Sequence, residues 1–285
     1  MAQAAGSAVE ETGAGGRGTG GPPGAGGGPY AWFYSGRMTY EGGFRVGDVL
    51  SVTCPFAETV VESGVTWDYL PVRWPWWSID TDSDLFHWNG VVALGLGNEG
   101  PSPGNPSELF RTDPPPHRLT TGDPCRIGIP PTPVHVTSVD RHDPPLETGW
   151  LPRPVLTVTV LPRGMSYREY PDGSHLDGFG HGLHPGDGTP YAFELLMRPY
   201  ACLRAGDEVA DADGRAWLFR GPWDWDAFDG GNSGPGPAWP LTLLTRSGLP
   251  RSAADAETVA TGSATGSHQD TVRRWMSLTG ASPTP

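Results

Sequence analysis

Lysine is absent from this sequence, and all nineteen basic residues are arginine. Against 32 Asp and Glu residues, they leave the 285-residue chain with a formal net charge of −13 at pH 7. A surface of this sign repels phosphate, which argues against nucleic-acid binding and suits either solubility or a basic partner. Arginine in place of lysine, together with 42 Gly and 32 Pro, is typical of a GC-rich, actinobacterial genome.

Cysteine and long apolar runs are also scarce. Cys54, Cys125 and Cys202 lie far apart and in no metal-ligand spacing, so we expect small buried thiols in a reducing cytoplasm. The longest apolar runs, such as residues 155–161, have the length of a strand, and the N-terminus lacks the pattern of a signal peptide. The sequence therefore predicts a soluble cytoplasmic protein with no membrane span.

Signatures of known catalytic sites are missing as well. The sequence has no G-x-S-x-G elbow, no H-E-x-x-H pair and no cysteine-protease motif. Its Gly-rich runs at 13–28 and 230–236 do not stand between a strand and a helix, so neither is expected to cradle phosphate. These absences favour a protein without enzymatic activity.

Apolar residues thin out toward both ends of the chain. Residues 1–28 and 247–285 consist largely of Gly, Ala, Pro, Ser and Thr, and such segments bury too little apolar surface to offset the entropy of ordering. Both ends are predicted to be disordered. One short helix is predicted within the C-terminal tail at 268–279, because Ser267 and Asp270 form a capping pattern and a glycine ends the run.

The segment between the two ends is predicted to be all-β. Pro and Gly recur every few residues, which excludes helical spacing, and alternating stretches such as 134–139 are typical of strands. Residues 190–229 also repeat the landmarks of residues 29–80 in the same order. An internal repeat of this kind indicates related structural modules.

The repeat contains a Gly-Asp pair that follows a strand-like segment. It occurs at Gly47-Asp48 and Gly206-Asp207, with a looser copy at Gly122-Asp123. We expect Gly to supply a positive φ and Asp to cap the turn through its side chain. This turn resembles the Gly-Asp box of small β-barrel families, including cradle-loop and SH3-like barrels, and the resemblance implies a barrel. The sequence thus predicts two or three tandem β-barrel-like modules at 29–105, 106–170 and 190–246, with a Gly/His/Asp loop at 171–189.

That loop holds the strongest candidate for chemistry. Its imidazoles and carboxylates are of the types that bind Zn, Mn or Fe, namely His175, Asp177, His181, His184 and Asp187. Their spacing matches no helical or strand pattern, so a metal site would depend on the conformation of the loop. Two interpretations stay open: one divalent metal ion in a hydrolase that uses residues 172–187, or a solvent-exposed linker and no cofactor.

A cluster of tryptophans is the second candidate. Trp74, Trp76 and Trp77 are echoed in the last module by Trp223 and Trp225. If exposed, these rings would stack on sugars or anchor a protein partner, and if buried they would close the end of each barrel. The recurrence favours the buried interpretation, and glycan binding stays open as the alternative.

The arginines of the Gly-Asp turns also have two interpretations. Arg45 and Arg204 either form a pocket for an anionic ligand or pair with the acidic residues Asp80 and Asp229, which close the same modules. The pairing is favoured because each module supplies its own arginine and its own aspartate.

Together these patterns predict a soluble, cytoplasmic, non-enzymatic binding or interaction protein. Its acidity favours an antagonist of a basic protein, of the kind that neutralises a toxin as an immunity protein. A metal-dependent hydrolase and a glycan-binding module are the alternatives from other functional classes.

Overall fold

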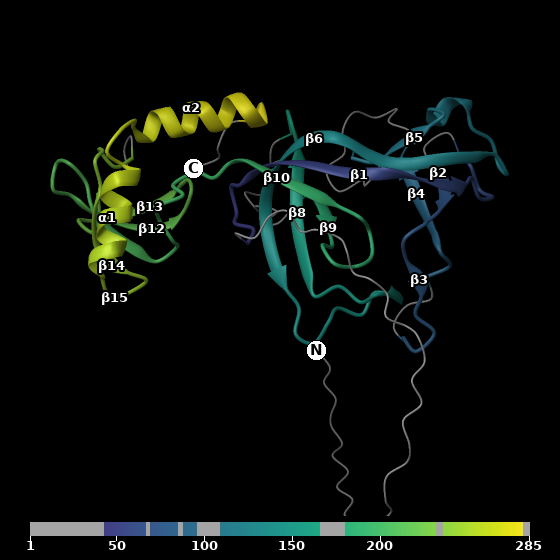
Figure 1. Ribbon diagram of the computed structural model, residues 1–285, viewed down its shortest axis with the longest axis horizontal. Coiled ribbons are helices and arrows are strands. Elements are labelled where there is room, and N and C mark those ends of the chain that lie inside the picture. Colours follow the sequence, from purple (N-terminus) through teal and green to yellow (C-terminus); the bar gives the residue numbers. More distant parts are fainter. Residues whose placement is uncertain are drawn as a thin grey trace, which may run out of the picture. The chain divides into compact units, whose positions relative to one another are not determined.

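The structure is a computed structural model that describes residues 43–66, 69–84, 88–95, 109–165, 180–231 and 236–281. In these residues the protein is mostly β, with fifteen strands, two α-helices and one short 3-10 helix, η2, at Pro116–Arg118 (Figure 1). The prediction of a β fold is therefore confirmed. The predicted disorder of residues 1–28 lies outside the described residues.

The larger sheet contains six strands and is antiparallel throughout. Five of them follow the order β10-β1-β6-β8-β9, and β5 pairs separately with β6. Long strands β1 and β6 form its centre, and their pairing is interrupted by register shifts. The six strands are β1 (Val49–Val60), β5 (Arg111–Asp113), β6 (Pro124–Arg141), β8 (Leu156–Pro162), β9 (His181–Leu183) and β10 (Ala192–Met197).

The predicted tandem modules are not confirmed, and the sequence leaves open whether they are separate barrels or parts of one assembly. The strands of the larger sheet come from all three predicted modules and from the loop between the second and third. The reason is that the strand after the first Gly-Asp turn pairs with the strand after the second, so that both bury apolar residues in one core. Among the described strands the sheet ends at β9 and β10 without closing, so the predicted barrel is not present there.

A second antiparallel sheet follows in the chain, with the order β13-β12-β11-β14-β15. Its core is built around Trp217, Leu203 and Leu243, which are almost fully buried. Two pairs of short strands, β2 with β4 and β3 with β7, complete the β structure of the described residues. These strands are β2 (Tyr69–Arg73), β3 (Ser78–Ile79), β4 (Val91–Gly95), β7 (Trp150–Leu151), β11 (Asp207–Ala210), β12 (Ala216–Gly221), β13 (Asp224–Ala227), β14 (Thr242–Arg246) and β15 (Leu249–Pro250).

The C-terminal region forms two helices, so the predicted disorder of the tail is wrong for its described residues. Helix α1 spans Ala253–Gly262, and α2 spans His268–Thr279, the residues for which the sequence predicts a helix. Each helix begins at a serine whose hydroxyl accepts the backbone N–H three residues later. The low apolar content of the tail predicts disorder, but its few large apolar side chains are buried, among them Val259 and Trp275.

Trp275 holds α2 against the rest of the fold. Its indole Nε1 donates to the carbonyl of Gly47 at 3.0 Å, and its ring packs edge-on against His135 and Trp223. It belongs to a small buried cluster with Val49 of β1. One side chain therefore connects α2 to the first strand, to β6 and to the turn before β13.

The three Gly-Asp turns share the geometry that the sequence predicts. Gly47, Gly122 and Gly206 have φ values of 85°, 90° and 86°. In each turn an aspartate oxygen accepts the backbone N–H of the residue three positions earlier, at 2.9 Å for Asp48, 2.8 Å for Asp123 and 2.8 Å for Asp207. The predicted geometry of the Gly-Asp turn, with a positive φ at Gly and a capping Asp, is therefore confirmed in all three copies.

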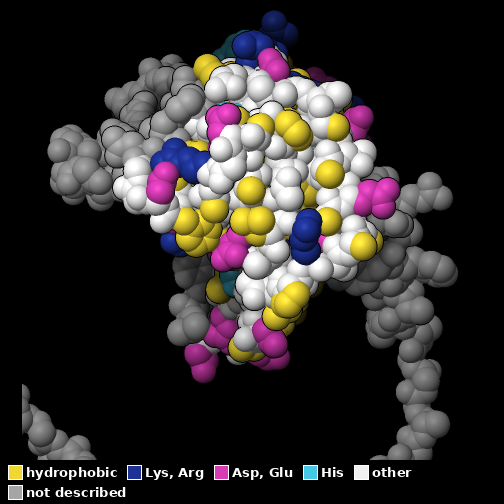
Figure 2. Space-filling model, turned by 90° about the vertical axis from the view of Figure 1, so that its left-hand side faces the viewer, with side chains coloured by type: hydrophobic (Ala, Val, Ile, Leu, Met, Phe, Trp, Pro, Cys, Tyr) yellow, Lys and Arg dark blue, Asp and Glu magenta, His cyan; other side chains and the backbone are white. Residues whose placement is uncertain are grey.

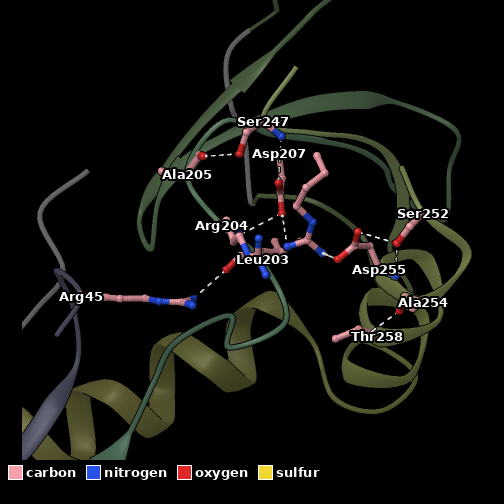
Figure 3. A network of polar contacts seen from close by, with 11 residues as sticks. Arg45, Leu203, Arg204, Ala205, Asp207, Ser247, Ser252, Ala254, Asp255 and Thr258 are labelled. Atoms are coloured by element: carbon pink, nitrogen blue, oxygen red, sulfur yellow. Dashed lines mark hydrogen bonds and ion pairs between the residues drawn. The ribbon is translucent and has the colours of Figure 1, made fainter. Parts of the chain in front are cut away.

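The third of these turns is also joined to α1 (Figure 3). Asp207 is fully buried, and its carboxylate accepts the backbone N–H of Ser247 at 3.2 Å and pairs with Arg246 at 3.2 Å. Arg246 also reaches Asp255 in the first turn of α1, at 3.4 Å. The capping aspartate therefore links β11, β14 and the helix.

The predicted pairing of the turn arginines is wrong. Asp80 pairs with Arg153 at 2.7 Å, and Asp229 pairs with Arg215 at 2.7 Å. Arg45 instead donates from its guanidinium to the carbonyl of Leu203, 3.0 Å away (Figure 3). Equivalent positions in a repeated turn thus have different tertiary partners.

Substituting the turn glycines should separate backbone strain from packing. Gly122→Ala should lower the free energy of unfolding by about 1 kcal/mol, because alanine resists positive φ. Its Cβ would meet no atom within 4 Å, so the loss reports backbone strain alone. Gly47→Ala should cost at least about 1 kcal/mol more, since its Cβ would lie 2.5 Å from Cγ of Pro222. Urea denaturation of both variants measures the difference. Equal losses would show that the contact between Gly47 and Pro222 is not tightly packed.

Candidate functional site

The two sequence candidates, the tryptophan segment and the His/Asp loop, meet in one place. The indole Nε1 of Trp77 donates to Oδ2 of Asp187 at 2.8 Å. Trp77 also stacks on Trp150, with ring centroids 4.4 Å apart and planes 7° apart, and His184 lies beside both rings. We call Trp77, Trp88, Trp150, His184 and Asp187 the Trp77 cluster.

Local structure explains why these residues come together. Trp77 directly precedes β3, which pairs with β7, and Trp150 is the first residue of β7. Asp187 stands in a tight turn after β9, where its N–H donates to the carbonyl of His184 at 3.1 Å. Gly186, with a φ of 96°, permits that turn. Two short β elements thus position an aromatic pair over a buried carboxylate.

Asp187 is the electrostatically unusual member of the cluster. Its side chain is 1% exposed, and no described Arg lies within ion-pair distance. Burial raises the pKa of this carboxyl to about 6, although hydrogen bonds from the Thr189 backbone and from Trp77 act in the opposite direction. Asp187 therefore titrates close to physiological pH.

Asp211 shows what makes Asp187 different. It is also buried and also accepts an indole N–H, from Trp217 at 2.9 Å. Burial raises its pKa too, but backbone N–H groups, including those of Asp213 and Arg215, join the indole and outweigh it, so the pKa is lowered. Asp187 is the more deeply buried of the two, at 1% exposed against 8% for Asp211, so desolvation outweighs the hydrogen bonds at Asp187 and not at Asp211.

The neighbours of Asp187 do not form an activated nucleophile. Burial, helped by the charge of Asp187, raises the pKa of Cys54 to about 12 and also raises the pKa of Tyr191, so both stay protonated at neutral pH. Burial lowers the pKa of His184 to about 4, and its Nδ1 lies 3.2 Å from the hydroxyl of Thr157. With the thiol and the phenol protonated, these groups supply no activated nucleophile.

The metal prediction gains no support from the described residues, which contain no group of three His, Cys, Asp or Glu arranged to hold an ion. His175 and Asp177 lie outside the described residues. His181 is buried in β9, and burial lowers its pKa to about 4. The prediction of a divalent ion stays a prediction.

The five candidate tryptophans are packed inward to different degrees. Trp74 and Trp225 are 5% and 4% exposed, and Trp76, Trp77 and Trp223 are partly buried. Trp74 contacts the rings of Trp76 and Trp77. In the second sheet, Trp223 contacts Tyr200 and Trp225 contacts Phe219. This arrangement favours the structural interpretation over a flat exposed platform for sugars.

A pocket of about 520 Å³ opens beside α2, and none of the candidate site residues named from the sequence lines it. Its walls are β10 with the residues that follow it, Trp239, and the segment from the end of α1 into α2. No motif marks these residues, because three distant segments contribute them. The capping pattern at Ser267 and part of the repeat segment 190–229 fall in the wall, but neither pattern indicates a binding site.

Most polar side chains of the pocket have partners within the protein. The Tyr200 hydroxyl lies 2.5 Å from Nδ1 of His268, whose pKa is lowered by burial. Arg198 forms a close ion pair with buried Asp48, at 2.7 Å. The carboxylate of Asp270 accepts from the N-cap hydroxyl of Ser267 and pairs with Arg273 at 2.7 Å.

Two groups of the pocket wall have no such partner. Arg274 is exposed and forms no ion pair with any residue that the structure describes. The indole Nε1 of Trp239 is buried, and the described residues offer it no hydrogen-bond acceptor. A buried donor without an acceptor is uncommon in proteins and indicates a missing partner such as water or a ligand.

Comparison with known proteins identifies no relative: no protein family, no curated protein and no solved structure matches this chain. Neither α1 nor α2 has the length and apolar character that a membrane crossing requires. The function is therefore inferred from the geometry of the chain itself.

Replacing Asp187 should change stability in a pH-dependent way. Because its folded pKa of about 6 exceeds the ordinary value of 3.8, Asp187 stabilises the fold below pH 4, and this contribution is lost as pH rises through 6. Asp187→Asn removes the titration. The unfolding free energy of the variant minus that of the wild type should therefore rise by about 2 kcal/mol between pH 4 and pH 7.

Asp211→Asn is the matched control. The lowered pKa of Asp211 means that its contribution is present above the unfolded pKa and lost as pH falls. Its variant should lose stability relative to the wild type as pH rises, opposite to Asp187→Asn. Urea denaturation from pH 2 to pH 8 covers both trends, since that of Asp211 falls mainly below pH 4, and a flat difference for Asp187→Asn would contradict the raised pKa.

Proposed function

We propose that this is a non-enzymatic binding protein that holds a small ligand in the pocket beside α2. The observation that carries the proposal is the pocket itself, about 520 Å³ in volume, with Trp239 and Arg274 among the residues of its wall. Ligand sites of proteins usually occupy roughly 300–1,000 Å³ and combine apolar walls with a few polar groups. Leu195, Leu196 and Met197 provide such an apolar wall.

The pocket is built on anchored elements. β10 is paired with β1 along its length, and α2 is attached through the buried Trp275. A wall held in this way needs little ordering when a ligand binds, which reduces the entropic cost of binding. The lack of an activated nucleophile around Asp187 supports binding over catalysis.

A bulky side chain at the pocket edge should block binding. Thr265 is exposed and lines the pocket, so Thr265→Trp should weaken binding of the neutral fluorescent probe N-phenyl-1-naphthylamine by about tenfold or more. Thr261→Trp, exposed on α1 and outside the pocket wall, is the control and should bind like the wild type. Fluorescence titration gives both affinities. Equal probe affinity for the three proteins would exclude the pocket as the binding site.

A second candidate function is that of a cytoplasmic antagonist of a basic protein. It is supported by the net charge of −13 and by the three free cysteines, which suit a reducing compartment. The face in Figure 2 shows more acidic than basic side chains, with hydrophobic ones scattered between them. In the second sheet, Asp213, Asp224 and Asp229 are exposed. Many arginines are already neutralised by acidic partners, among them Arg73, Arg153, Arg198, Arg215, Arg220, Arg246 and Arg273.

This second candidate requires a salt-sensitive complex. The protein purified from its host at low ionic strength should carry a basic protein that dissociates in about 0.5 M salt. The double variant Asp213→Arg and Asp224→Arg should lose that partner, and Glu58→Arg on β1 should keep it. Recovery of the wild type as a single free species at low salt would exclude this function.

A further inference from the structure

We infer that the pocket beside α2 takes an apolar anion, that is, an aliphatic or aromatic body with one acidic group. The inference rests on the proposed binding function and adds the chemical class of the ligand. It comes from the charges, the donors and the apolar surface of the pocket wall.

The local charge of the pocket is opposite to that of the chain. Arg198 and Arg274 line it, and Arg198 is neutralised by Asp48. Asp270 also lines it and is neutralised by Arg273. Two ion pairs cancel, which leaves one positive charge, on Arg274, in a chain of net charge −13. The pocket therefore attracts an anion although the protein as a whole repels one.

The charged group of the wall that has no ion-pair partner among the described residues is a hydrogen-bond donor. It is the Arg274 guanidinium, which cannot accept a hydrogen bond. By contrast, the carboxylate of Asp270 already accepts from Ser267 and Arg273, and the Tyr200 hydroxyl is paired with His268. A ligand that hydrogen-bonds to Arg274 must contain acceptor atoms, such as the oxygens of a carboxylate or a sulfonate.

The beginning of α2 adds to this preference. Ser267 and Thr271 of its N-terminal region line the pocket, and the N-terminal end of a helix carries partial positive charge. The opposite wall, Leu195 to Met197 of β10, is apolar. A ligand with an acidic group near α2 and an apolar body against β10 matches both sides.

Two probes with one aromatic scaffold test this inference. 1-Anilinonaphthalene-8-sulfonate is N-phenyl-1-naphthylamine with an added sulfonate, so the pair isolates the effect of the anionic group. Arg274→Gln should weaken binding of the sulfonate about five- to tenfold and leave the affinity for the neutral probe within about twofold. Raising the salt concentration should likewise weaken only the sulfonate.

Arg251→Gln is the control, because Arg251 is an exposed arginine that does not line the pocket and neutralises none of the pocket carboxylates. It should bind both probes like the wild type. If Arg274→Gln leaves sulfonate binding unchanged while Thr265→Trp still blocks the neutral probe, the pocket binds ligands but the anion preference is wrong. If Thr265→Trp affects neither probe, the proposed binding function itself fails.

Discussion

The buried carboxylate of Asp48 is the interaction on which the rest of the structure depends. One of its oxygens accepts the backbone N–H of Arg45 and closes the first Gly-Asp turn. The same carboxylate accepts two hydrogen bonds from Arg198, at 2.8 and 2.7 Å, just after β10. Removing either partner of a buried pair leaves an uncompensated charge, which costs about 3–5 kcal/mol. The start of β1 and the exit from β10 are therefore stabilised by one group.

The other two Gly-Asp turns show that a repeated local device need not have a repeated tertiary role. Asp207 is as buried as Asp48 but pairs with Arg246, which leads toward α1. Asp123 is more exposed and accepts only from the backbone and hydroxyl of Thr120. The turn needs a glycine and a carboxylate, whereas the partner depends on which strands lie nearby.

The same distinction explains what sequence reasoning could predict. The Gly-Asp turns and α2 depend on contacts three or four residues apart, such as Ser267 with Asp270, and these are visible as patterns. Strand pairing is not local: β1 pairs with both β6 and β10, and nothing in the alternation of either strand specifies its neighbour. The turns of the repeat were therefore predictable from the sequence, whereas the arrangement of the tandem modules stays a prediction.

Site prediction met the same limit. Residue types pointed to Trp77 and Asp187 separately, and the hydrogen bond between them spans 110 residues. The pocket beside α2 was not predicted, because Arg274, which has no ion-pair partner among the described residues, looks in sequence like its paired neighbour Arg273. Only the fold shows that one of these arginines is neutralised and the other is not.

The ion pair between Asp48 and Arg198 also affects the charge of the pocket. Arg198 belongs to the pocket wall, but Asp48 neutralises it, so it contributes shape and little net charge. Arg274 then carries the uncompensated charge, at the edge of an apolar wall and beside the helix that Trp275 holds in place. In a chain with 32 acidic residues and nineteen arginines, most cations are used to satisfy internal carboxylates. An arginine left unpaired at a pocket is therefore the charge most available to a ligand.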